Sequence, residues 1–334
     1  MPKTREHRPI PAASHRVCVA PMMDYTDRHF RYLIRLMSRH TRLYTEMLTS
    51  GALLNGDSRR HLAFHSAEHP LALQVGGSDP GELARCTRLA VDYGYDEINL
   101  NVGCPSERVQ SGRFGACLMT EPMLVADCVA AMSAAGGIPV SVKTRIGVDE
   151  HDSYAHLADF IHTVSTGGCN LFIIHARKAW LHGLSPKQNR ELPPLQYANV
   201  RRLKQDFPSL TIVINGGIQT LEDMQSHLNS LDGVMIGREA LANPYLFAQV
   251  DLACFGEPGS VHSRSQLLED WLPYVESQLR AGVPLARMSR HVLGIFKGCP
   301  GARRWRRILS ETCTLPEATI QSLDAALSVV QENA

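Results

Sequence analysis

LALQVGGSDPGELARCTRLAVDYGYDEINLNVG, residues 71–103, contains one complete strand, helix and strand in succession. The apolar runs LALQVGG (71–77) and EINLNVG (97–103) are typical of buried strands. Between them PGELARCTRLAVDYG (80–94) is amphipathic, with a glycine at its end. Its apolar stripe consists of Leu83, Ala84, Ala90 and Val91. A strand that is followed by a helix and a further strand predicts a parallel sheet covered by helices.

The same pattern recurs along the chain. Six further apolar runs precede a turn and, in most cases, a segment of helical period; they are VCVAPM (17–22), LYTEM (43–47), PVSVKTR (139–145), LFIIHAR (171–177), TIVINGG (211–217) and GVMIGR (233–238). Eight such units in about 240 residues match the roughly 250 residues of a (β/α)8 barrel. An open doubly wound sheet uses the same alternation. It is disfavoured because no G-x-G-x-x-G follows the first strand and because polar residues end nearly all eight strands.

The strand pattern stops after about residue 250. FGEPGS (255–260) is typical of a linker, and the chain from Ser263 onward has a helical pattern. We therefore predict an α/β fold in which a (β/α)8 TIM barrel (16–255) is followed by a small C-terminal helical domain (260–334). The first 15 residues are predicted to form a disordered lead-in.

The composition limits the class of protein. Hydrophobic residues make up 44% of the 334 residues and charged residues 20%, which excludes a disordered or fibrous chain. The net charge of +1 means that a nucleic-acid surface would have to be a local patch. No run approaches the roughly 18 apolar residues of a membrane span, and the N-terminus lacks the apolar segment of a secretory signal. We expect a cytoplasmic protein without a membrane partner.

Nine cysteines are scattered along the chain without a C-x-x-C pair. This spacing predicts neither a disulfide framework nor a metal site. We expect most of them to be small buried hydrophobic residues in a reducing compartment. They are Cys18, Cys86, Cys104, Cys117, Cys128, Cys169, Cys254, Cys299 and Cys313.

Polar and small residues gather where the predicted strands end. In a barrel these ends and the following loops form the active face. The residues are Pro21, Met22, Met23, Glu46, Gln74, Asn99, Asn101, Cys104, Lys143, Arg145, His175, Arg177, Asn215, Gly216, Gly217, Gly237 and Arg238. The small residues of INGGI and MIGREA lie after the seventh and eighth strands, where such barrels often bind phosphate. A tight turn without a ligand is the alternative for each of them.

Lys143 lies inside the apolar strand VSVKTRIG. A buried ammonium is costly unless it reaches an anion, so this lysine suits a reduced flavin, which carries negative charge near N1. The alternative, a surface lysine on an edge strand, fits a closed barrel poorly. His175 alone would suit a core histidine. Because Arg177 follows two residues later, we interpret the pair as contacts to an anion or a ring.

The predicted helical domain contains a basic stretch. From Arg280 to Arg307 there are eight lysine or arginine residues and no acidic residue. Such a run is often only a solvated helix face. Here GARRWRR (301–307) sets Trp305 among four arginines, which suits phosphate contacts and some stacking on RNA.

Taken together, these motifs resemble the tRNA-dihydrouridine synthases over roughly residues 16–312. The resemblance rests on APMMDYTDRHFR, LQVGGSDP, EINLNVGCPSERVQSGRFGACLM, VKTRIG, IIHARKAWLHGLSPKQNRELPPL, NGGI and IGREALANPY, and GARRWRRILS makes the DusA branch the closest in pattern. It implies an FMN-binding barrel with a helical tRNA-binding domain. It also implies that NADPH supplies the electrons and that uridines 20 and 20a of the tRNA D-loop are reduced at C5=C6.

The resemblance further implies a role for each matching residue. Cys104 falls on the proton donor of the family, and Asn101 on a position that faces the target uridine. The flavin contacts fall on Pro21, Met22, Met23, Gln74, Lys143, His175, Asn215, Gly216, Gly217, Gly237 and Arg238. The tRNA contacts fall on Lys187, Arg190, Arg303 and Arg306.

This chemistry explains a thiol in a polar loop. Hydride transfer from flavin N5 to uracil C6 leaves negative charge on C5 and O4, so C5 needs a proton. A thiol, with an ordinary pKa of about 8.5, is protonated at cellular pH and can still release its proton. Gly103 and Pro105 flank Cys104 with flexibility and stiffness, whereas the alternative, one more buried small residue, suits the other eight cysteines. The uridine must leave its stack to reach the flavin.

Two other functions remain open at this point. A flavin barrel could oxidise or reduce a free pyrimidine such as dihydroorotate, although such an enzyme has no need of the basic stretch. Alternatively, the barrel could be inactive and the chain a tRNA-binding protein or folding helper. The preference for NADPH rests on the resemblance alone, and we expect a monomer.

Overall fold

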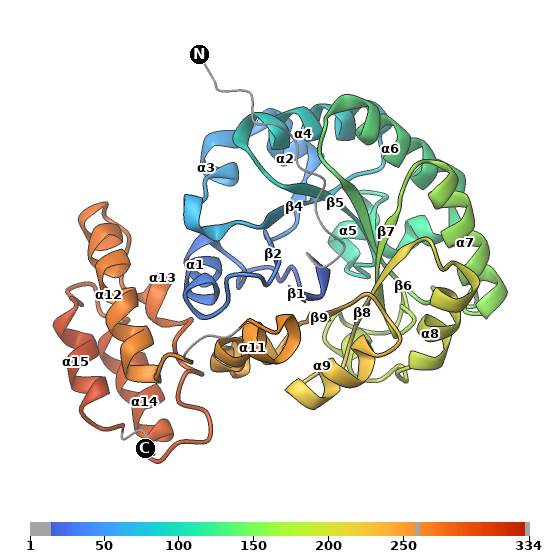
Figure 1. Ribbon diagram of the computed structural model, residues 1–334. Coiled ribbons are helices and arrows are strands. Elements are labelled where there is room, and N and C mark those ends of the chain that lie inside the picture. The colour runs from blue at the N-terminus through green and yellow to red at the C-terminus, as the bar shows by residue number, and fades with distance from the viewer. Residues whose placement is uncertain (1–14, 258–260, 331–334) are drawn as a thin grey trace.

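The computed structural model describes residues 15–257 and 261–330, and its centre is a barrel of parallel strands (Figure 1). Within these residues the sheet order is β1, β9, β8, β7, β6, β5, β4, β2, and β3 also pairs with β4. The strands are β1 (Val17–Val19), β2 (Leu43–Tyr44), β3 (Leu48–Thr49), β4 (Leu71–Gly76), β5 (Glu97–Val102), β6 (Val140–Arg145), β7 (Leu171–His175), β8 (Thr211–Asn215) and β9 (Gly233–Ile236). Arg42 closes the ring, because its N–H donates to Val17 O and its carbonyl accepts from Val19 N, both at 2.9 Å.

Helices surround the barrel, as Figure 1 shows. Around the barrel they are α1 (Arg28–Met37), α2 (Ser50–Asn55), α3 (Ser58–Leu62), α4 (Pro80–Tyr93), α5 (Glu107–Ser111), α6 (Pro122–Ala135), α7 (Tyr154–Thr166), α8 (Tyr197–Asp206), α9 (Leu221–Leu228), α10 (Glu239–Ala242) and α11 (Val250–Phe255), with the 3₁₀ turns η2 (Ser66–Glu68), η3 (Gly115–Thr120), η4 (Gln188–Arg190) and η5 (Pro244–Gln249). The C-terminal region adds α12 (Arg264–Arg280), α13 (Ala286–Ser289), α14 (Ala302–Thr312) and α15 (Gln321–Leu327). The predicted barrel and the helical region after it are confirmed.

The alternation of side chains along each strand produces two apolar cores. The larger core lies between the sheet and the helices and includes Leu71, Leu73 and Val75 of β4. A smaller core fills part of the barrel interior. It consists of Cys18, Ala20, Tyr44, Ala72, Leu171, Ile173, Val213 and Met235.

The helix that was predicted over 80–94 begins and ends where its sequence indicates. Asp79 is its N-cap and accepts a hydrogen bond from Glu82 N at 2.7 Å. Gly94 ends α4 with φ at 86°, a left-handed conformation that glycine adopts without strain. Strand and helix limits inside this unit therefore follow from local sequence signals.

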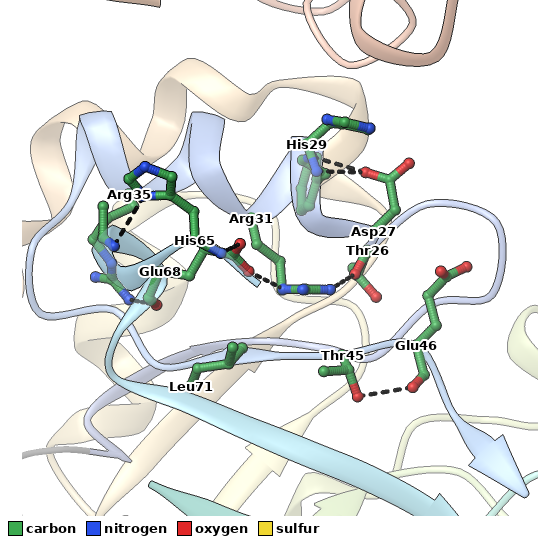
Figure 2. Close-up of polar contacts among 12 residues, drawn as sticks. Thr26, Asp27, His29, Arg31, Arg35, Thr45, Glu46, His65, Glu68 and Leu71 are labelled. Atoms are coloured by element: carbon green, nitrogen blue, oxygen red, sulfur yellow. Dashed lines mark hydrogen bonds and ion pairs between the residues drawn. The ribbon is translucent and has the colours of Figure 1, made fainter. Parts of the chain in front are cut away.

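The loop between β1 and α1 is fixed by the first turns of the helix (Figure 2). Asp27 caps α1 by accepting from His29 N and Phe30 N. Arg31 of the same helix donates to Thr26 O at 2.7 Å and forms a buried ion pair with Glu68 at 2.6 Å. These contacts hold the segment that follows the carboxyl end of β1.

The C-terminal helical region packs against α1. Tyr274 of α12 stacks on Tyr32 with ring centroids 3.9 Å apart, and its hydroxyl hydrogen-bonds His29 at 2.8 Å. His291 lies 3.0 Å from Asp27, the cap of α1. Helix α1 thus joins the barrel to the helical region.

The beginning of the chain lies partly outside the described residues. Residues 1–14 of the predicted lead-in belong to that part. His15, the last residue of the predicted lead-in, is buried and lies 2.6 Å from Glu97 inside the barrel. In the described ranges, each helix is too short or too polar to cross a membrane.

Candidate active site

The polar strand ends lie side by side at the carboxyl end of the barrel. The strand register pairs Asn101 of β5 with Lys143 of β6. It also pairs Arg145 of β6 with His175 of β7, and His175 with Asn215 of β8. Residues that are spread over 115 positions of sequence, from Asn101 to Asn215, therefore share one rim.

Cys104 lies in a turn two residues beyond the end of β5 and is partly buried. The Asn101 Oδ1 atom accepts hydrogen bonds from Gly103 N at 3.1 Å and Cys104 N at 3.0 Å. Ala116 N donates to Cys104 O at 2.9 Å, and Arg145 Nε donates to Gly103 O, also at 2.9 Å. Both sides of the turn are thus held by protein groups, and the thiol at the rim lies 3.5 Å from Ser106 Oγ, to which it can donate.

Two cations lie next to this turn. Lys143 is largely buried, and its Nζ lies 3.2 Å from Asn215 Oδ1. Arg145 is 4% exposed and donates to the carbonyls of Gly103, Lys178 and Asn189. Burial, with a further contribution from Arg145, lowers the pKa of Lys143 to about 7. Within the described part of the chain no carboxylate pairs with either cation, so the site can accommodate an anion.

His175 lies beside these cations at the end of β7. Burial lowers its pKa well below 6.5, and the charges of Arg145 and Lys143 act in the same direction, so the ring is neutral near pH 7. Arg177 is beyond the strand, and its guanidinium donates to Pro193 O. The alternation argument that paired Arg177 with His175 therefore does not apply, because β7 ends first.

The two glycine turns lie where they were predicted, after β8 and β9. Gly216 and Gly217 have φ of 114° and 74°, values that favour glycine. A Cβ on Gly216 would lie 2.7 Å from the His175 ring, whereas the same position on Gly237 opens onto free space. Next to Gly237, Arg238 pairs with Glu191 at 2.6 Å on the surface.

The loop after β1 forms another part of the rim. Pro21 and Met22 are partly buried, and Met23 is 53% exposed. Asp24 follows with φ at 66°, and its N–H donates to Glu46 at 2.5 Å. From the helical region, Arg290 donates to Asp24 O. Groups of the barrel and of the C-terminal helical region therefore hold this loop.

Polar side chains also line the barrel below the rim. Gln74 donates to Asn99 Oδ1 at 2.7 Å and accepts from Asn101 Nδ2 at 3.0 Å. Asn99 Nδ2 donates to Ser141 Oγ at 2.7 Å. Sequence reasoning missed Ser141 and Glu97 as parts of this site. The signal is the alternation of polar and apolar residues in EINLN (97–101) for Glu97 and in VSVK (140–143) for Ser141.

Glu97 lies at the start of β5, deep in the barrel, and is fully buried. Burial alone would raise the pKa of its carboxyl. The charges of His15 and Arg42, together with hydrogen bonds from His15 and Ser141, nevertheless lower it to about 2. The carboxylate is therefore ionised at neutral pH.

The four residues that were predicted to contact tRNA are all exposed. Lys187 and Arg190 lie at η4 in the loop after β7, and Arg238 Nη2 lies 3.5 Å from Arg190 O. Arg303 and Arg306 lie on α14. They are therefore on different parts of the molecule, one pair at the rim and the other in the helical region.

Trp305 contradicts one part of our interpretation of the basic stretch, the stacking on RNA. Its side chain is 1% exposed, its indole N–H donates to Val292 O at 3.0 Å, and its ring meets Phe296 edge to face. The residue is thus part of the core of the helical region and cannot stack on RNA. The arginines around it lie on the exposed side of α14, because the buried side of that helix consists of Trp305 and Leu309.

The described cysteines are all free. Six of the eight other than Cys104 are buried, while Cys117 and Cys299 are partly buried. The described residues contain no group of three or more potential metal ligands from histidine, cysteine and acidic side chains. In this part of the chain, the thiol that combines a rim position with neighbouring cations is therefore Cys104.

Several known proteins are similar to this chain over nearly its whole length. Relatives named tRNA-dihydrouridine(20/20a) synthase are 58% identical in Vibrio parahaemolyticus over 95% of this chain and 97% of theirs, and 58% in Shewanella oneidensis over 94% and 93%. The relative of that name in Escherichia coli K12 is 56% identical over 96% of this chain and 92% of its own.

A solved 2-naphthoyl-CoA reductase has a similar fold. It superposes with a TM-score of 0.57 at 11% identity, over 75% of this chain and 52% of that one. This likeness concerns the fold alone. In sequence, the family model described as dihydrouridine synthase (Dus) matches residues 18–331. From this match and from the full-length relatives, the chain belongs to the dihydrouridine synthase family.

Proposed function

We propose that this chain is a tRNA-dihydrouridine(20/20a) synthase, which reduces the C5=C6 bond of uridines 20 and 20a in the tRNA D-loop. The observation that carries the proposal is the 56–58% identity to proteins of that name over 94–96% of this chain. At this extent of similarity the site and the helical region are both included in the match. If the chain were a free-pyrimidine enzyme or an inactive binding protein, this identity to tRNA-dihydrouridine(20/20a) synthases would need another explanation.

The residues at the rim suit FMN. Lys143 and Arg145 are enclosed positive charges without a paired carboxylate in the described chain, and an anionic ligand would balance them. After β9, a Cβ position on Gly237 has no atom within 4 Å, which leaves room for close approach of a phosphate. The residues that would hold the cofactor are Pro21, Met22, Met23, Gln74, Lys143, His175, Asn215, Gly216, Gly217, Gly237 and Arg238.

Bound FMN in its reduced form would supply a hydride for C6 of the uracil ring. The electron pair of the C5=C6 bond then resides on C5 and O4, and C5 must gain a proton. Cys104 Sγ–H would give that proton. The resulting thiolate lies near the charges of Lys143 and Arg145 and regains its proton from solvent. One hydride and one proton are added, which balances the reduction to dihydrouridine.

The proposed RNA contacts use charge on both domains. Lys187 and Arg190 would bind phosphates beside the rim, and Arg303 and Arg306 would bind phosphates along α14. Asn101 Oδ1 accepts from the Cys104 turn and Nδ2 donates one hydrogen to Gln74, so the second Nδ2 hydrogen would face the target uridine. The uridine must be unstacked to reach this position.

NADPH as the reductant rests on membership of the family. We expect the purified protein to be yellow and to bleach anaerobically with NADPH faster than with NADH. A colourless protein that cannot be reconstituted with FMN would instead support the inactive binding protein. Turnover of free uridine or uracil without tRNA would support the free-pyrimidine enzyme.

The decisive experiment concerns Cys104. We expect Cys104→Ala to keep bound flavin and its reduction by NADPH, while dihydrouridine at positions 20 and 20a forms 10² to 10⁴ times more slowly, a range typical of a lost general acid. Mass spectrometry of digested tRNA measures the product by position. Cys117→Ala is the matched control, because Cys117 is also partly buried and lies in the same loop. Equal rates in the two variants would refute the role of Cys104.

A further inference from the structure

A continuous series of hydrogen bonds runs inside the barrel from its buried end to the Cys104 turn. At the buried end Ser141 Oγ donates to Glu97 Oε1 (2.5 Å), and Asn99 Nδ2 donates to Ser141 Oγ (2.7 Å). Gln74 Nε2 donates to Asn99 Oδ1 (2.7 Å), and Asn101 Nδ2 donates to Gln74 Oε1 (3.0 Å). At the other end Gly103 N and Cys104 N donate to Asn101 Oδ1 (3.1 and 3.0 Å). All five side chains are at most 9% exposed. We refer to this series as the barrel chain.

The negative charge of the Glu97 carboxylate fixes which group donates and which accepts in each hydrogen bond of the barrel chain. An ionised carboxylate only accepts, so the Ser141 hydroxyl must donate to Glu97. Its oxygen is then the acceptor for Asn99, which has to present Nδ2 to it. That choice turns Asn99 Oδ1 toward Gln74. The amide of Gln74 is fixed in the same way, with Nε2 toward Asn99 and Oε1 toward Asn101.

The other end of the barrel chain meets the catalytic turn. With Nδ2 toward Gln74, Asn101 presents Oδ1 to two backbone donors, those of Gly103 and Cys104. If this amide rotated by 180°, its NH₂ would face two N–H groups, and both would lose their acceptor. A lost acceptor for a buried donor typically costs about 1–3 kcal/mol. The orientation of Asn101 therefore controls the turn that holds the thiol.

Several contacts hold the Glu97 carboxylate in place at the buried end of the barrel chain. It lies 2.6 Å from His15 and 3.4 Å from Arg42, and it accepts from the Tyr44 hydroxyl at 3.0 Å. The strands β7, β8 and β9 contribute Ile173, Val213 and Met235 to the apolar core of the interior. The barrel interior therefore accommodates apolar side chains. The polar side chains of the barrel chain, which are costly to bury, lie instead on the strands next to the Cys104 turn.

We propose that Ser141 and Asn99 are positioning residues, which transmit the direction set by the Glu97 carboxylate through the amides of Gln74 and Asn101 and so hold the Cys104 turn. The importance of that turn for catalysis rests on the proposed function. Its geometry can be tested separately.

The test uses the full-length protein with Ser141→Ala. We expect amide hydrogen exchange at Gly103 and Cys104, resolved to single residues by mass spectrometry, to become about tenfold faster. The kcat for dihydrouridine formation should fall by about 10- to 100-fold with the KM for tRNA within twofold, because misplacement of a reacting group mainly slows the chemical step. Ser141→Thr keeps the hydroxyl and should restore both values.

Ser38→Ala is the matched control. Ser38 is also a buried serine whose hydroxyl donates to a carboxylate, that of Asp251 at 2.5 Å, but it belongs to the segment between α1 and β2. We expect wild-type exchange at Gly103 and Cys104 in this variant. Wild-type exchange in Ser141→Ala, or equal acceleration in both variants, would overturn the proposal.

A second variant decides the question if Ser141→Ala does not fold. Asn99→Asp still offers Gln74 only an acceptor, so the amides beyond it should keep their orientation and Gly103 and Cys104 should stay protected. Rapid exchange at these two positions in a folded Asn99→Asp protein would contradict the inference. If the wild-type protein forms no dihydrouridine, the proposed function fails, whereas the exchange data still decide the role of the barrel chain.

Discussion

At the scale of single residues, Lys143 is an enclosed cation within the barrel strand β6. A lysine inside an apolar strand indicated an enclosed cation, and the structure confirms it, because β6 lies between β5 and β7 and is not an edge strand. The pattern could not indicate that Asn215 would be its neighbour, or that Arg145 would lie beside it without a carboxylate. Those partners depend on register between strands, which is a non-local property.

Lys143 also leads to a prediction about pH. In the free protein burial lowers its pKa to about 7, and a bound anion would raise it again, so FMN binding above pH 7 must take up a proton. We therefore expect the Kd for FMN to rise about tenfold from pH 7 to pH 8.5, measured by quenching of flavin fluorescence. Lys143→Met should bind more weakly at pH 7 and lose this slope. Lys204→Met, which removes a lysine paired with Asp232 outside the site, should keep it. An unchanged slope in Lys143→Met would contradict the assignment.

At the scale of elements, local signals located the eight predicted strands, but not all their limits. The run 43–47 was predicted as one strand, whereas the structure contains β2 (Leu43–Tyr44) and a separate β3 (Leu48–Thr49). Both pair with β4, and Thr45 Oγ1 between them accepts from Gln74 N at 3.0 Å. At this position the hydroxyl of Thr45, and not a backbone carbonyl, accepts the hydrogen bond from β4. Such a substitution depends on which strand lies opposite, so it is not visible in the sequence of the run.

The loop after β5 supplies a prediction at the same scale. Gly115 has φ at 79°, and a Cβ there would lie 2.4 Å from Val109 Cγ1 and 2.5 Å from Cys104 O. We expect Gly115→Ala to lower the free energy of unfolding by more than 2 kcal/mol in urea titration, since backbone strain and overpacking each cost about 1–3 kcal/mol. Gly94→Ala is the control, because Gly94 has φ at 86° with nothing within 4 Å. It should cost only the strain, and equal losses would show that the contact with Cys104 O is not restrictive.

At the scale of the whole molecule, the sequence indicated that a helical region follows the barrel but not how the two meet. Two of the eight basic residues between 280 and 307 are used in that contact. Arg290 binds Asp24 O beside the rim, and Lys297 pairs with Glu239 at 2.6 Å. The remaining exposed arginines of α14 include Arg303 and Arg306. A count of charges therefore overestimates the basic surface that is free for RNA, because packing between distant segments decides which side chains stay exposed.

The exposed pair on α14 gives the last prediction. Each arginine that neutralises a phosphate releases counterions, so the dependence of log Kd on log salt concentration measures how many such contacts exist. We expect the double variant Arg303→Ala and Arg306→Ala to weaken tRNA binding most at low salt and to reduce the magnitude of this slope by about 1.4 to 1.8, the release expected for two contacts. NADPH oxidation in the absence of tRNA should stay unchanged, because neither residue lies at the barrel rim. Arg85→Ala with Arg88→Ala removes the same charge from exposed positions of α4 and should leave the slope at its wild-type value. If the two double variants reduced the slope equally, the chain's charge as a whole would govern binding. With a net charge of only +1, the protein is expected instead to depend on where its arginines lie.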